Sequence, residues 1–283
     1  MASVSDTTGT ETPSRLYGTG LRLAYGDHVI AENLDFTVAD RGVTAIIGPN
    51  GCGKSTLLRA LGRLLRPAAG EVILDGAPIA ARPPKEVART VAVLPQSPQA
   101  PAGLSVGDLV ARGRHPHQSW YRQWSTTDHH AVSEALELTG MQEHAERALD
   151  QLSGGQRQRA WISMALAQDT DLLLLDEPTT FLDLAHQIEV LDLVRTLNSR
   201  HGRTVVMVLH DLNLAARYAH YLVAMRDGTV VEAGAPRQVL TPELMATTFD
   251  LNAQIITDPV AGTPMVVPAS TTDTEPVVTA PVG

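Results

Sequence analysis

The stretch GPNGCGKS, residues 48–55, decides the fold of this chain because it fits the pattern GxxxxGK(S/T) in full. The continuous apolar run VTAIIG at 43–48 precedes it and is typical of a strand inside a parallel sheet. Apolar residues at helical spacing follow from 54 to 65. Glycines let the backbone curl so that its N–H groups point at phosphate oxygens, and a helix start adds partial positive charge. The stretch therefore predicts a phosphate-binding loop between a strand and a helix.

The last residues of this loop have predictable roles. Lys54 is expected to reach the β- and γ-phosphates of a nucleotide, Ser55 to place its hydroxyl on Mg²⁺, and Thr56 to contact the α-phosphate side. Cys52 fits either as a small residue at a position that the pattern leaves free, or as a thiol whose pKa is lowered by the helix start. The other predicted nucleotide-binding residues are those of the loop itself: Gly48, Pro49, Asn50, Gly51, Cys52 and Gly53.

A second apolar stretch, LLLL at 172–175, ends in the carboxylates Asp176 and Glu177. At the end of a strand beside a phosphate-binding loop, Asp176 is expected to hold Mg²⁺ and Glu177 to polarise an attacking water as general base. A solvated loop would be the better interpretation of this pair in isolation. Together with the loop at 48–55, the pair predicts a site that hydrolyses a nucleotide.

Strand and helix patterns alternate along much of the remaining chain. Short alternating apolar runs between 21 and 38 indicate antiparallel strands, whereas 97–150 indicates helices and polar loops. These patterns predict a parallel α/β core with an antiparallel flank and an inserted helical segment. Further strands are predicted at 71–76, 91–96 and 204–210, helices from Ser153, Asp183 and Leu212, and hairpins with turns at 226–228 and 259–264.

The composition excludes several classes of protein. Of 283 residues, 43% are hydrophobic and 19% charged, as in an ordinary globular protein. A net charge of −9 argues against a protein that coats nucleic acid, and a single cysteine excludes an intrachain disulfide. No apolar run approaches the roughly 18 residues of a spanning helix, and the N-terminus lacks a secretory signal. We therefore expect a soluble, intracellular chain without a nucleic-acid partner, with disordered ends at 1–14 and 269–283.

Five further features accompany the loop and the carboxylate pair. The first is LSGGQ at 152–156, which ends 20 residues before Asp176. The three motifs together closely resemble those of the ATP-binding cassette (ABC) family, and the likeness extends from about residue 16 to 268. The other four features resemble further motifs of that family: Gln96 its Q-loop glutamine, Thr180-Phe181-Leu182-Asp183 its D-loop, His210 its switch histidine, and Tyr25 the aromatic residue that stacks on adenine.

The resemblance implies ATP and Mg²⁺ as cofactors and a head-to-tail homodimer, in which LSGGQ closes over the loop of a facing subunit. Plainer interpretations remain open for Tyr25 as a half-buried strand residue, Gln96 as a loop residue and His210 as a strand-end histidine. The implied catalytic residues are Lys54, Gln96, Glu177 and His210, and the implied metal ligands are Ser55, Gln96 and Asp176. The nucleotide contacts implied outside the loop are Tyr25, Gln96, Ser153, Gly154, Gly155, Gln156 and Asp183.

The resemblance also implies a fold class: α/β, with a P-loop NTPase (RecA-like) core, an antiparallel β flank and an inserted α-helical subdomain. One ABC ATPase domain is expected at 15–268. Within it, the core and its antiparallel flank occupy 15–96 and 151–249, the helical insert 97–150, and a C-terminal β hairpin 250–268.

Two long stretches, SVGDLVARGRHPHQSW at 105–120 and PTTFLDLAHQIEVLDLVRTLN at 178–198, resemble importers of iron–siderophores and vitamin B12. The implied function is an ATP-hydrolysing subunit for ferric-siderophore uptake through two separate permease subunits, served indirectly by a binding lipoprotein or periplasmic receptor. Such a subunit lies peripherally on the cytoplasmic face of the bacterial inner membrane, and a groove after Gln96 and around 112–117 would take a permease helix. The alternatives are a haem or cobalamin importer and a soluble regulatory ABC ATPase, although single motif copies and an insert without heptads disfavour the soluble ABC machines.

Overall fold

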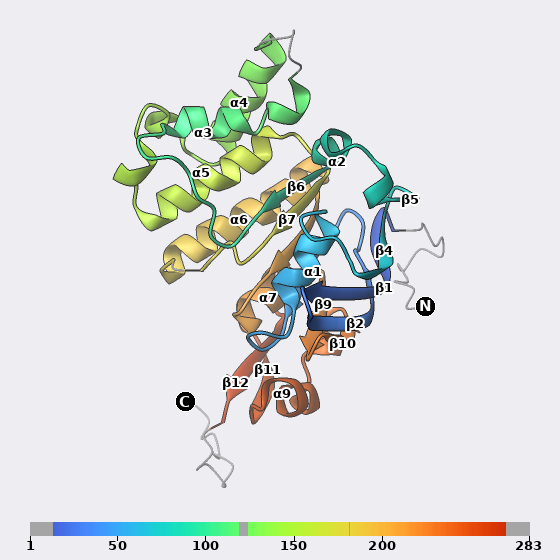
Figure 1. Cartoon of the computed structure of the whole chain (residues 1–283). Helices are drawn as coiled ribbons and strands as arrows, with labels where there is room; N and C mark the ends of the chain where they lie inside the picture. The colour runs from blue at the N-terminus through green and yellow to red at the C-terminus, as the bar shows by residue number, and fades with distance from the viewer. Residues whose placement is uncertain (1–13, 119–123, 181, 270–283) are drawn as a thin grey trace, which may run out of the picture.

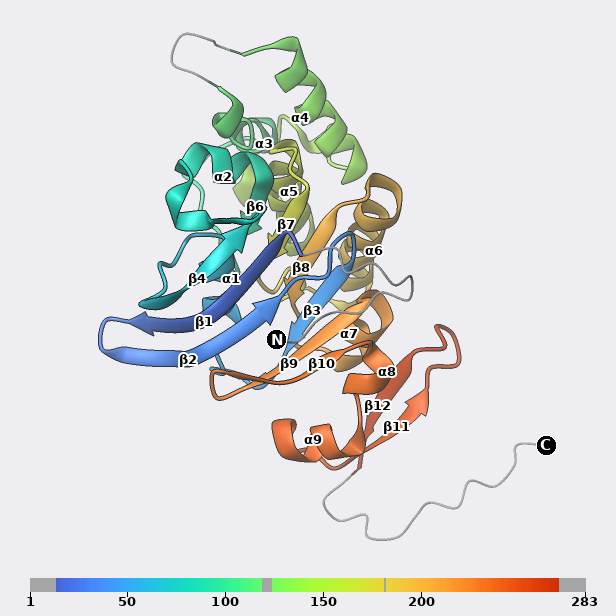
Figure 2. The same cartoon turned by 90° about the vertical axis from the view of Figure 1, so that its right-hand side faces the viewer.

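The computed structural model describes residues 14–118, 124–180 and 182–269. Its centre is a six-stranded sheet in the order β10-β9-β3-β8-β7-β6, in which β9 to β6 are parallel and β10 is antiparallel. A second, antiparallel sheet and a helical segment flank this sheet (Figures 1 and 2). The bounds of the central strands are β3 Val43–Ile47, β6 Val91–Leu94, β7 Leu172–Leu175, β8 Thr204–Val208, β9 Tyr221–Arg226 and β10 Thr229–Gly234.

Alternate residues of the central strands face two separate cores. In β3, Ala45 and Ile47 pack into one core and Ile46 into the other, and β7 divides in the same way. A sheet covered on both faces explains why β3 and β7 are almost entirely apolar, as the sequence predicts for a parallel sheet. The first core includes α5 (Gly154–Ala167), α6 (Leu184–His201) and α7 (Leu212–Tyr218), and the second includes α1 (Lys54–Leu61) and the antiparallel sheet.

The antiparallel sheet has the strand order β2-β1-β4-β5 and confirms the predicted flank. Apolar side chains of β1 and β2, among them Leu21, Leu23 and Phe36, join the second core with α1. The sheet therefore packs on the face of the central sheet that carries the phosphate-binding loop's helix. Its strands are β1 Leu16–Tyr25, β2 His28–Thr37, β4 Ala69–Leu74 and β5 Ala77–Pro78.

The predicted disordered ends lie outside the described residues, except for Ser14 and Ala269. Ser14 donates from Oγ to the carbonyl oxygen of Val38 at 2.6 Å. The backbone N–H of Ala269 donates to the carbonyl oxygen of Asn252, with an N···O distance of 2.9 Å. Each of these two residues is thus bonded to the folded domain, one residue beyond the bounds that the sequence predicts.

The helical insert contains α3 (Val106–Arg112) and α4 (Thr126–Leu138), both packed against α5. A buried ion pair lies between them: Arg114 Nε donates to Asp128 Oδ1 at 2.8 Å, and both side chains are less than a tenth exposed. Arg114 Nη1 also donates to the carbonyl oxygen of Ala167 at 2.8 Å. Burial raises the pKa of Asp128, but bonds from Ser125 and Arg114 outweigh it and bring this pKa from 3.8 to about 2.

Replacing Arg114 with methionine is expected to destabilise the fold by about 3 kcal/mol, because it leaves the buried Asp128 carboxylate without its partner. Arg112→Met, at an exposed position two residues earlier, is the matched control and should cost less than about 0.5 kcal/mol. Urea unfolding followed by circular dichroism measures both. The stabilisation that ionised Asp128 provides should be complete above pH 3.8 and be lost as the pH falls through about 2. Equal losses in the two variants at neutral pH would contradict this account.

The C-terminal hairpin is anchored to α7. β11 (Ala253–Thr257) and β12 (Pro264–Pro268) pair antiparallel, as predicted. The side-chain amide of Asn213 in α7 donates from Nδ2 to the carbonyl oxygen of Val266 at 3.2 Å and accepts from Val266 N at 2.7 Å. It therefore bonds the backbone of β12 as a neighbouring strand would.

Three short helices are not indicated by the sequence patterns, and one helix is shorter than predicted. Each of the three begins with a proline at its first position, a start signal present in the sequence. α1 ends at Leu61 rather than at residue 65, because Arg63 adopts a left-handed φ of 59° and the N–H of Leu64 then bonds back to the carbonyl oxygen of Arg59 at 2.7 Å. No helix among the described residues is long and apolar enough to cross a bilayer. The three helices are α2 (Pro84–Thr90), α8 (Pro236–Val239) and α9 (Pro242–Phe249).

Candidate nucleotide-binding site

The glycine-rich loop joins the end of β3 to the start of α1, as the sequence predicts. Two of its positions require glycine. A Cβ on Gly48 would lie 2.2 Å from the carbonyl oxygen of Met225. Gly53, the residue immediately before α1, has φ of 103°, which residues with a side chain rarely adopt. The close approach to β9 and the left-handed turn therefore shape the loop.

A cavity of about 220 Å³ opens at the start of α1. It is bounded by the loop, the first turn of the helix, the end of β7 and β2. Every lining residue except Ile30 belongs to the predicted nucleotide-binding or catalytic set. The lining residues are Ile30, Asn50, Gly51, Gly53, Lys54, Ser55, Thr56 and Glu177. The predicted site residues outside this lining are Tyr25, Gly48, Pro49, Cys52, Gln96, Ser153, Gly154, Gly155, Gln156, Asp176, Asp183 and His210.

Lys54 and Ser55 both have defined partners. Lys54 Nζ donates to the carbonyl oxygens of Gly48 and Pro49 at 2.8 and 2.9 Å, so its nearly buried side chain folds back over the loop. Ser55 Oγ donates to Asp176 Oδ1 at 2.7 Å and links α1 to the end of β7. The structure therefore brings together the hydroxyl and the carboxylate that the sequence predicts to share a metal ion.

Asp176 also has a carboxylate oxygen without a partner. Its Oδ2 is buried and accepts no hydrogen bond from the described residues. Burial raises the pKa of Asp176, although the bond from Ser55 acts in the opposite direction. A buried, unsatisfied acceptor beside a serine hydroxyl is unusual in proteins, and carboxylate and hydroxyl oxygens are ligands of hard divalent cations. These residues therefore fit a Mg²⁺ ion.

Glu177 accepts bonds from three different parts of the chain. Gln96 Nε2, after β6, and Thr180 Oγ1 donate to its Oε2 at 2.5 and 2.9 Å. His210, which follows β8, places Nε2 2.7 Å from its Oε1. Burial raises the pKa of Glu177, but the bonds from Thr180, His210 and Gln96 lower it by more, so this pKa lies below its usual value. The carboxylate is therefore held in its ionised form.

Tyr25 and Cys52 had two interpretations each. Tyr25 is the last residue of β1 and is 44% exposed, and its hydroxyl accepts a hydrogen bond from Nη1 of Arg59 in α1 at 3.2 Å, so both interpretations of Tyr25 remain open. Cys52 is buried, and this burial raises the pKa of its thiol. The alternative of an activated thiol at this position is therefore wrong, and Cys52 acts as a small packed residue.

The LSGGQ stretch begins α5 with a reciprocal cap. Gln156 N donates to Ser153 Oγ at 3.2 Å, and Ser153 N donates to Gln156 Oε1 at 3.1 Å. Gly155 packs on the first turn of α6, because a Cβ there would lie 2.6 Å from the ring of His186. That ring is held by Asp183, which caps α6 and contacts His186 Nδ1 at 2.6 Å. The structure thus brings Gly155 and Asp183 together around one histidine.

The sequence patterns do not indicate two residues of the site, Ile30 in the cavity wall and Arg59 beside Tyr25, or one contact, the hydrogen bond from Thr180 to Glu177. Ile30 and Arg59 belong to no motif and reach the site through packing of separate elements. The bond from Thr180 could have been predicted, because a threonine three residues after a glutamate can close a local turn with its hydroxyl.

The loop after β3, the serine–aspartate pair between α1 and β7 and the bonded glutamate beside it define a nucleoside triphosphatase of the P-loop class. A sequence profile described as ABC transporter matches residues 31–180, which is more than half of the chain. The chain therefore belongs to the ABC transporter family and carries the family's ATPase domain. This finding confirms both the predicted resemblance and the predicted fold class.

Similar proteins support this assignment over most of the chain. "Probable siderophore transport system ATP-binding protein YusV" of Bacillus subtilis is 55% identical over 248 residues, which cover 88% of this chain and 90% of that protein. Ferric enterobactin transport ATP-binding protein FepC of Escherichia coli is 52% identical over 263 residues, which cover 93% of this chain and 97% of that protein. An inward-facing ABC transporter assigned to the metal-chelate type matches with a TM-score of 0.78 and 30% identity (92% and 98%). A dimeric post-hydrolysis ATP-binding cassette with ADP and Pi matches with a TM-score of 0.68 and 27% identity, which covers 78% of this chain and 98% of that chain.

Proposed function

We propose that this chain is the ATP-hydrolysing subunit of a ferric-siderophore importer, peripheral on the cytoplasmic face of the bacterial inner membrane. The observation that carries the proposal is its identity of more than half, over nearly all of its length, to ATP-binding proteins named for siderophore and ferric enterobactin transport. The family itself supplies the ATPase activity, and the relatives support the cargo. Haem or cobalamin is the alternative cargo, and a soluble regulatory ATPase is the alternative class.

In the proposed reaction Glu177 is the general base. Its ionised carboxylate can accept a proton from water, and it lines the cavity beside Lys54 and Ser55. His210, 2.7 Å from Oε1, orients the carboxylate and the attacking water. Lys54 and the N–H groups at the start of α1 stabilise charge on the β- and γ-phosphates. Tyr25, exposed at the end of β1, is the proposed platform for adenine.

Mg²⁺ is the proposed metal cofactor. Ser55 and Asp176 would hold it, with Gln96 as a third ligand from the end of β6. When bound, the ion supplies positive charge that neutralises phosphate oxygens. Gln96 also donates to Glu177, so one side chain links the proposed metal ligands to the proposed base and to the segment that leads into the helical insert.

The site is proposed to be completed by a second copy of the chain. No residue of LSGGQ lines the cavity described above, and Ser153 is exposed at the start of α5. A helix start with free N–H groups suits a γ-phosphate, and a dimer with two-fold symmetry would supply one to each cavity. The dimeric cassette among the similar structures supports this arrangement.

Ser153→Arg is expected to leave ATP binding by the single chain intact and to prevent ATP-dependent dimerisation, because the exposed position tolerates the side chain only until a second copy covers it. The substitution also removes the α5 cap, which is worth about 1 kcal/mol. Ser153→Ala loses the cap without adding bulk and is the matched control. Size-exclusion chromatography with ATP and ATP binding measured by fluorescence separate the effects. Normal hydrolysis by Ser153→Arg would contradict the composite site.

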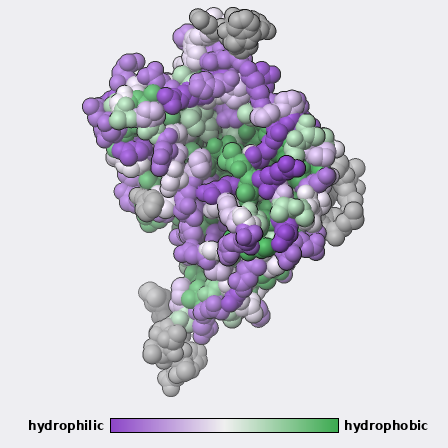
Figure 3. Space-filling model, in the orientation of Figure 1, coloured by the Kyte–Doolittle hydropathy of each residue, from purple (hydrophilic) through white to green (hydrophobic). Residues whose placement is uncertain are grey.

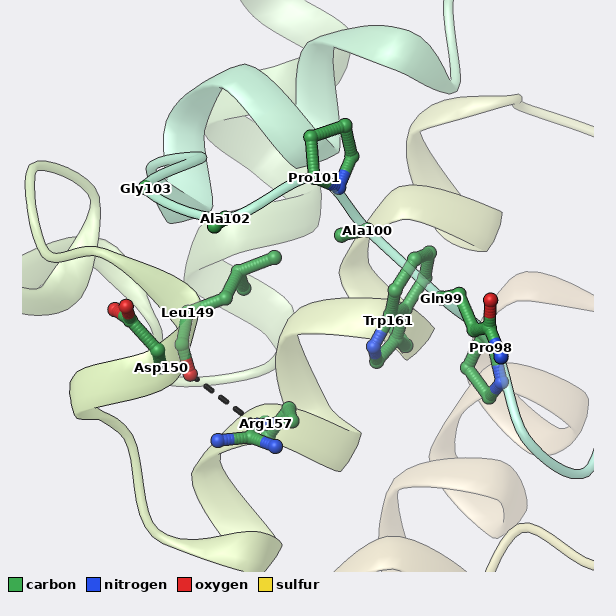
Figure 4. Close-up of a pocket in the computed structure, with 10 residues that line it drawn as sticks. All are labelled: Pro98, Gln99, Ala100, Pro101, Ala102, Gly103, Leu149, Asp150, Arg157 and Trp161. Atoms are coloured by element: carbon green, nitrogen blue, oxygen red, sulfur yellow. Dashed lines mark hydrogen bonds between the residues drawn. The ribbon is translucent and has the colours of Figure 1, made fainter.

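A second cavity supports the proposed contact with a permease. It measures about 320 Å³ and lies between the segment 98–103, which follows Gln96, and α5 with its preceding turn (Figure 4). Trp161 and Arg157 of α5 form one wall, and Arg157 Nε donates to the carbonyl oxygen of Leu149 at 3.2 Å. Figure 3 shows apolar residues in the middle of one face of the molecule, beside hydrophilic ones.

The predicted groove is changed in one respect. Residues 112–117 do not line this cavity, although the family resemblance implies that they form part of the groove. They pack instead against α2 and the end of α5: Arg89 Nε donates to the carbonyl oxygen of Pro116 at 2.8 Å, and His117 Nε2 lies 2.8 Å from the carbonyl oxygen of Gln168. The proposed docking surface for a permease helix is therefore the cavity beside Gln96, lined by residues 98–103, Leu149, Asp150, Arg157 and Trp161.

Reconstitution with its permease tests the function. We expect permease-containing liposomes to stimulate the ATPase and to accumulate a ferric siderophore in an ATP-dependent manner. Competition with haem and cobalamin decides the cargo. Stimulation without any uptake of iron chelates would reject siderophores, and an ATPase rate indifferent to permease would favour the soluble regulatory class.

A further inference from the structure

Residues 177–180 form a tight turn that directly follows the end of β7. The backbone N–H of Thr180 donates to the carbonyl oxygen of Glu177 at 3.2 Å, and its hydroxyl donates to Glu177 Oε2 at 2.9 Å. Glu177 itself has φ of 52°, in the left-handed region that residues with a side chain seldom occupy. Both bonds from Thr180 close the turn around this conformation, so one threonine fixes both the backbone and the carboxylate of the glutamate.

The three donors to Glu177 differ in how they are attached to it. Gln96 and His210 come from the ends of β6 and β8, on the two strands that flank β7. Thr180 is three residues away on the same turn. A displacement of the segment after β6 or of the segment after β8 would therefore change the Gln96 or His210 contact without changing the bond from Thr180. Of the three donors, only Thr180 is held to the glutamate by a short stretch of backbone.

The two carboxylate oxygens of Glu177 have different partners. Thr180 and Gln96 share Oε2, whereas His210 lies at Oε1. With Oε2 fixed from within the turn, Oε1 is the oxygen left to exchange between His210 and a water molecule. Valine has nearly the volume of threonine but cannot donate a hydrogen bond. A valine at this position would therefore remove the bond to Oε2 without changing the packing.

We propose that Thr180 is a positioning residue for ATP hydrolysis: its hydroxyl holds Oε2 of Glu177, so that Oε1 faces the attacking water. This inference rests on the proposed role of Glu177 as general base. Thr180 touches neither nucleotide nor water in this proposal, and its contribution is confined to the step in which Glu177 accepts a proton. It should therefore affect turnover and leave nucleotide affinity unchanged.

The test compares Thr180→Val with Thr180→Ser in the full-length chain. We expect Thr180→Val to lower kcat by about tenfold to a hundredfold, the range for loss of a hydrogen bond to a charged group, with the KM for ATP unchanged. Thr180→Ser retains the hydroxyl and should stay within about twofold of the wild type. Equal losses in both variants, or a KM that rises with the fall in kcat, would overturn the proposal. Melting temperatures of both variants guard against misfolding.

A double-mutant cycle separates this inference from the role of Glu177. In single-turnover assays, Thr180→Val should add little to the loss caused by Glu177→Gln, because both changes act on the same proton transfer. A full additional loss in the double variant would overturn the positioning role. If Glu177→Gln alone retains wild-type turnover, the general-base assignment fails instead. If Glu177→Gln stalls and Thr180→Val turns over normally, only the positioning inference fails.

Discussion

Glu177→Gln should abolish steady-state ATP turnover, with a loss of about 100-fold to 10,000-fold, while ATP binding remains. The amide has the size of the carboxylate but cannot accept a proton from water. The substitution also removes a negative charge from the cavity beside Lys54, and this loss of charge favours the binding of phosphates. Phosphate release measures the loss of turnover, and size-exclusion chromatography should show a stable dimer that requires ATP.

The same chemical change at a remote position controls for the charge. Glu71, exposed on β4, is suited to it, and Glu71→Gln should hydrolyse ATP at the wild-type rate. Turnover by Glu177→Gln within tenfold of the wild type would refute the general-base role. In that event, the three hydrogen bonds to Glu177 would need a purely structural explanation.

Lys54→Ala should weaken ATP binding by about 100-fold, because the variant loses a cation that would make charge-assisted bonds to two phosphates. The side chain of Lys54 is nearly buried and already bonds the carbonyl oxygens of Gly48 and Pro49. Little side-chain entropy therefore remains to be lost when ATP binds. Titration with a fluorescent ATP analogue measures the affinity.

Lys85 provides the matched control, since it is the chain's only other lysine and is exposed on α2. Lys85→Ala should bind ATP with wild-type affinity. A lysine-directed reagent applied to the Lys85→Ala variant would then report on Lys54, and ATP should protect that residue. Wild-type affinity in Lys54→Ala would show that the backbone N–H groups alone hold the phosphates.

The central sheet could be predicted from sequence because its strands are buried on both faces. The runs of β3 and β7 contain one polar residue, Thr44, and are otherwise apolar on both faces, which favours a parallel, covered sheet. The short helices α2, α8 and α9 could not be predicted with the same ease. Each has at most eight residues and depends on packing against neighbouring elements rather than on a periodic apolar face.

The site divides in a similar way. Contacts between two motifs whose places in a known fold are fixed, such as Ser55 with Asp176, follow from the sequence even though the residues are far apart along the chain. Contacts that depend on how separate elements pack do not: the Arg59 bond to Tyr25 joins α1 to β1, and the His186 ring fills the space that a side chain at Gly155 would need. Residue type predicts the chemistry of such groups but not their neighbours.

The anchor of the C-terminal hairpin has a consequence for how this protein can diversify. Asn213 bonds only backbone atoms of Val266, and the side chains that also hold the hairpin, Asp258 and Val266 among them, point toward the domain and not outward. Ile256, Val260 and Val267, all exposed on or between its two strands, can therefore be exchanged without loosening it from α7. The position of the hairpin is therefore fixed, whereas its exposed side chains can vary. Related chains can acquire different contacts at this surface while α7 and the nearby His210 remain undisturbed.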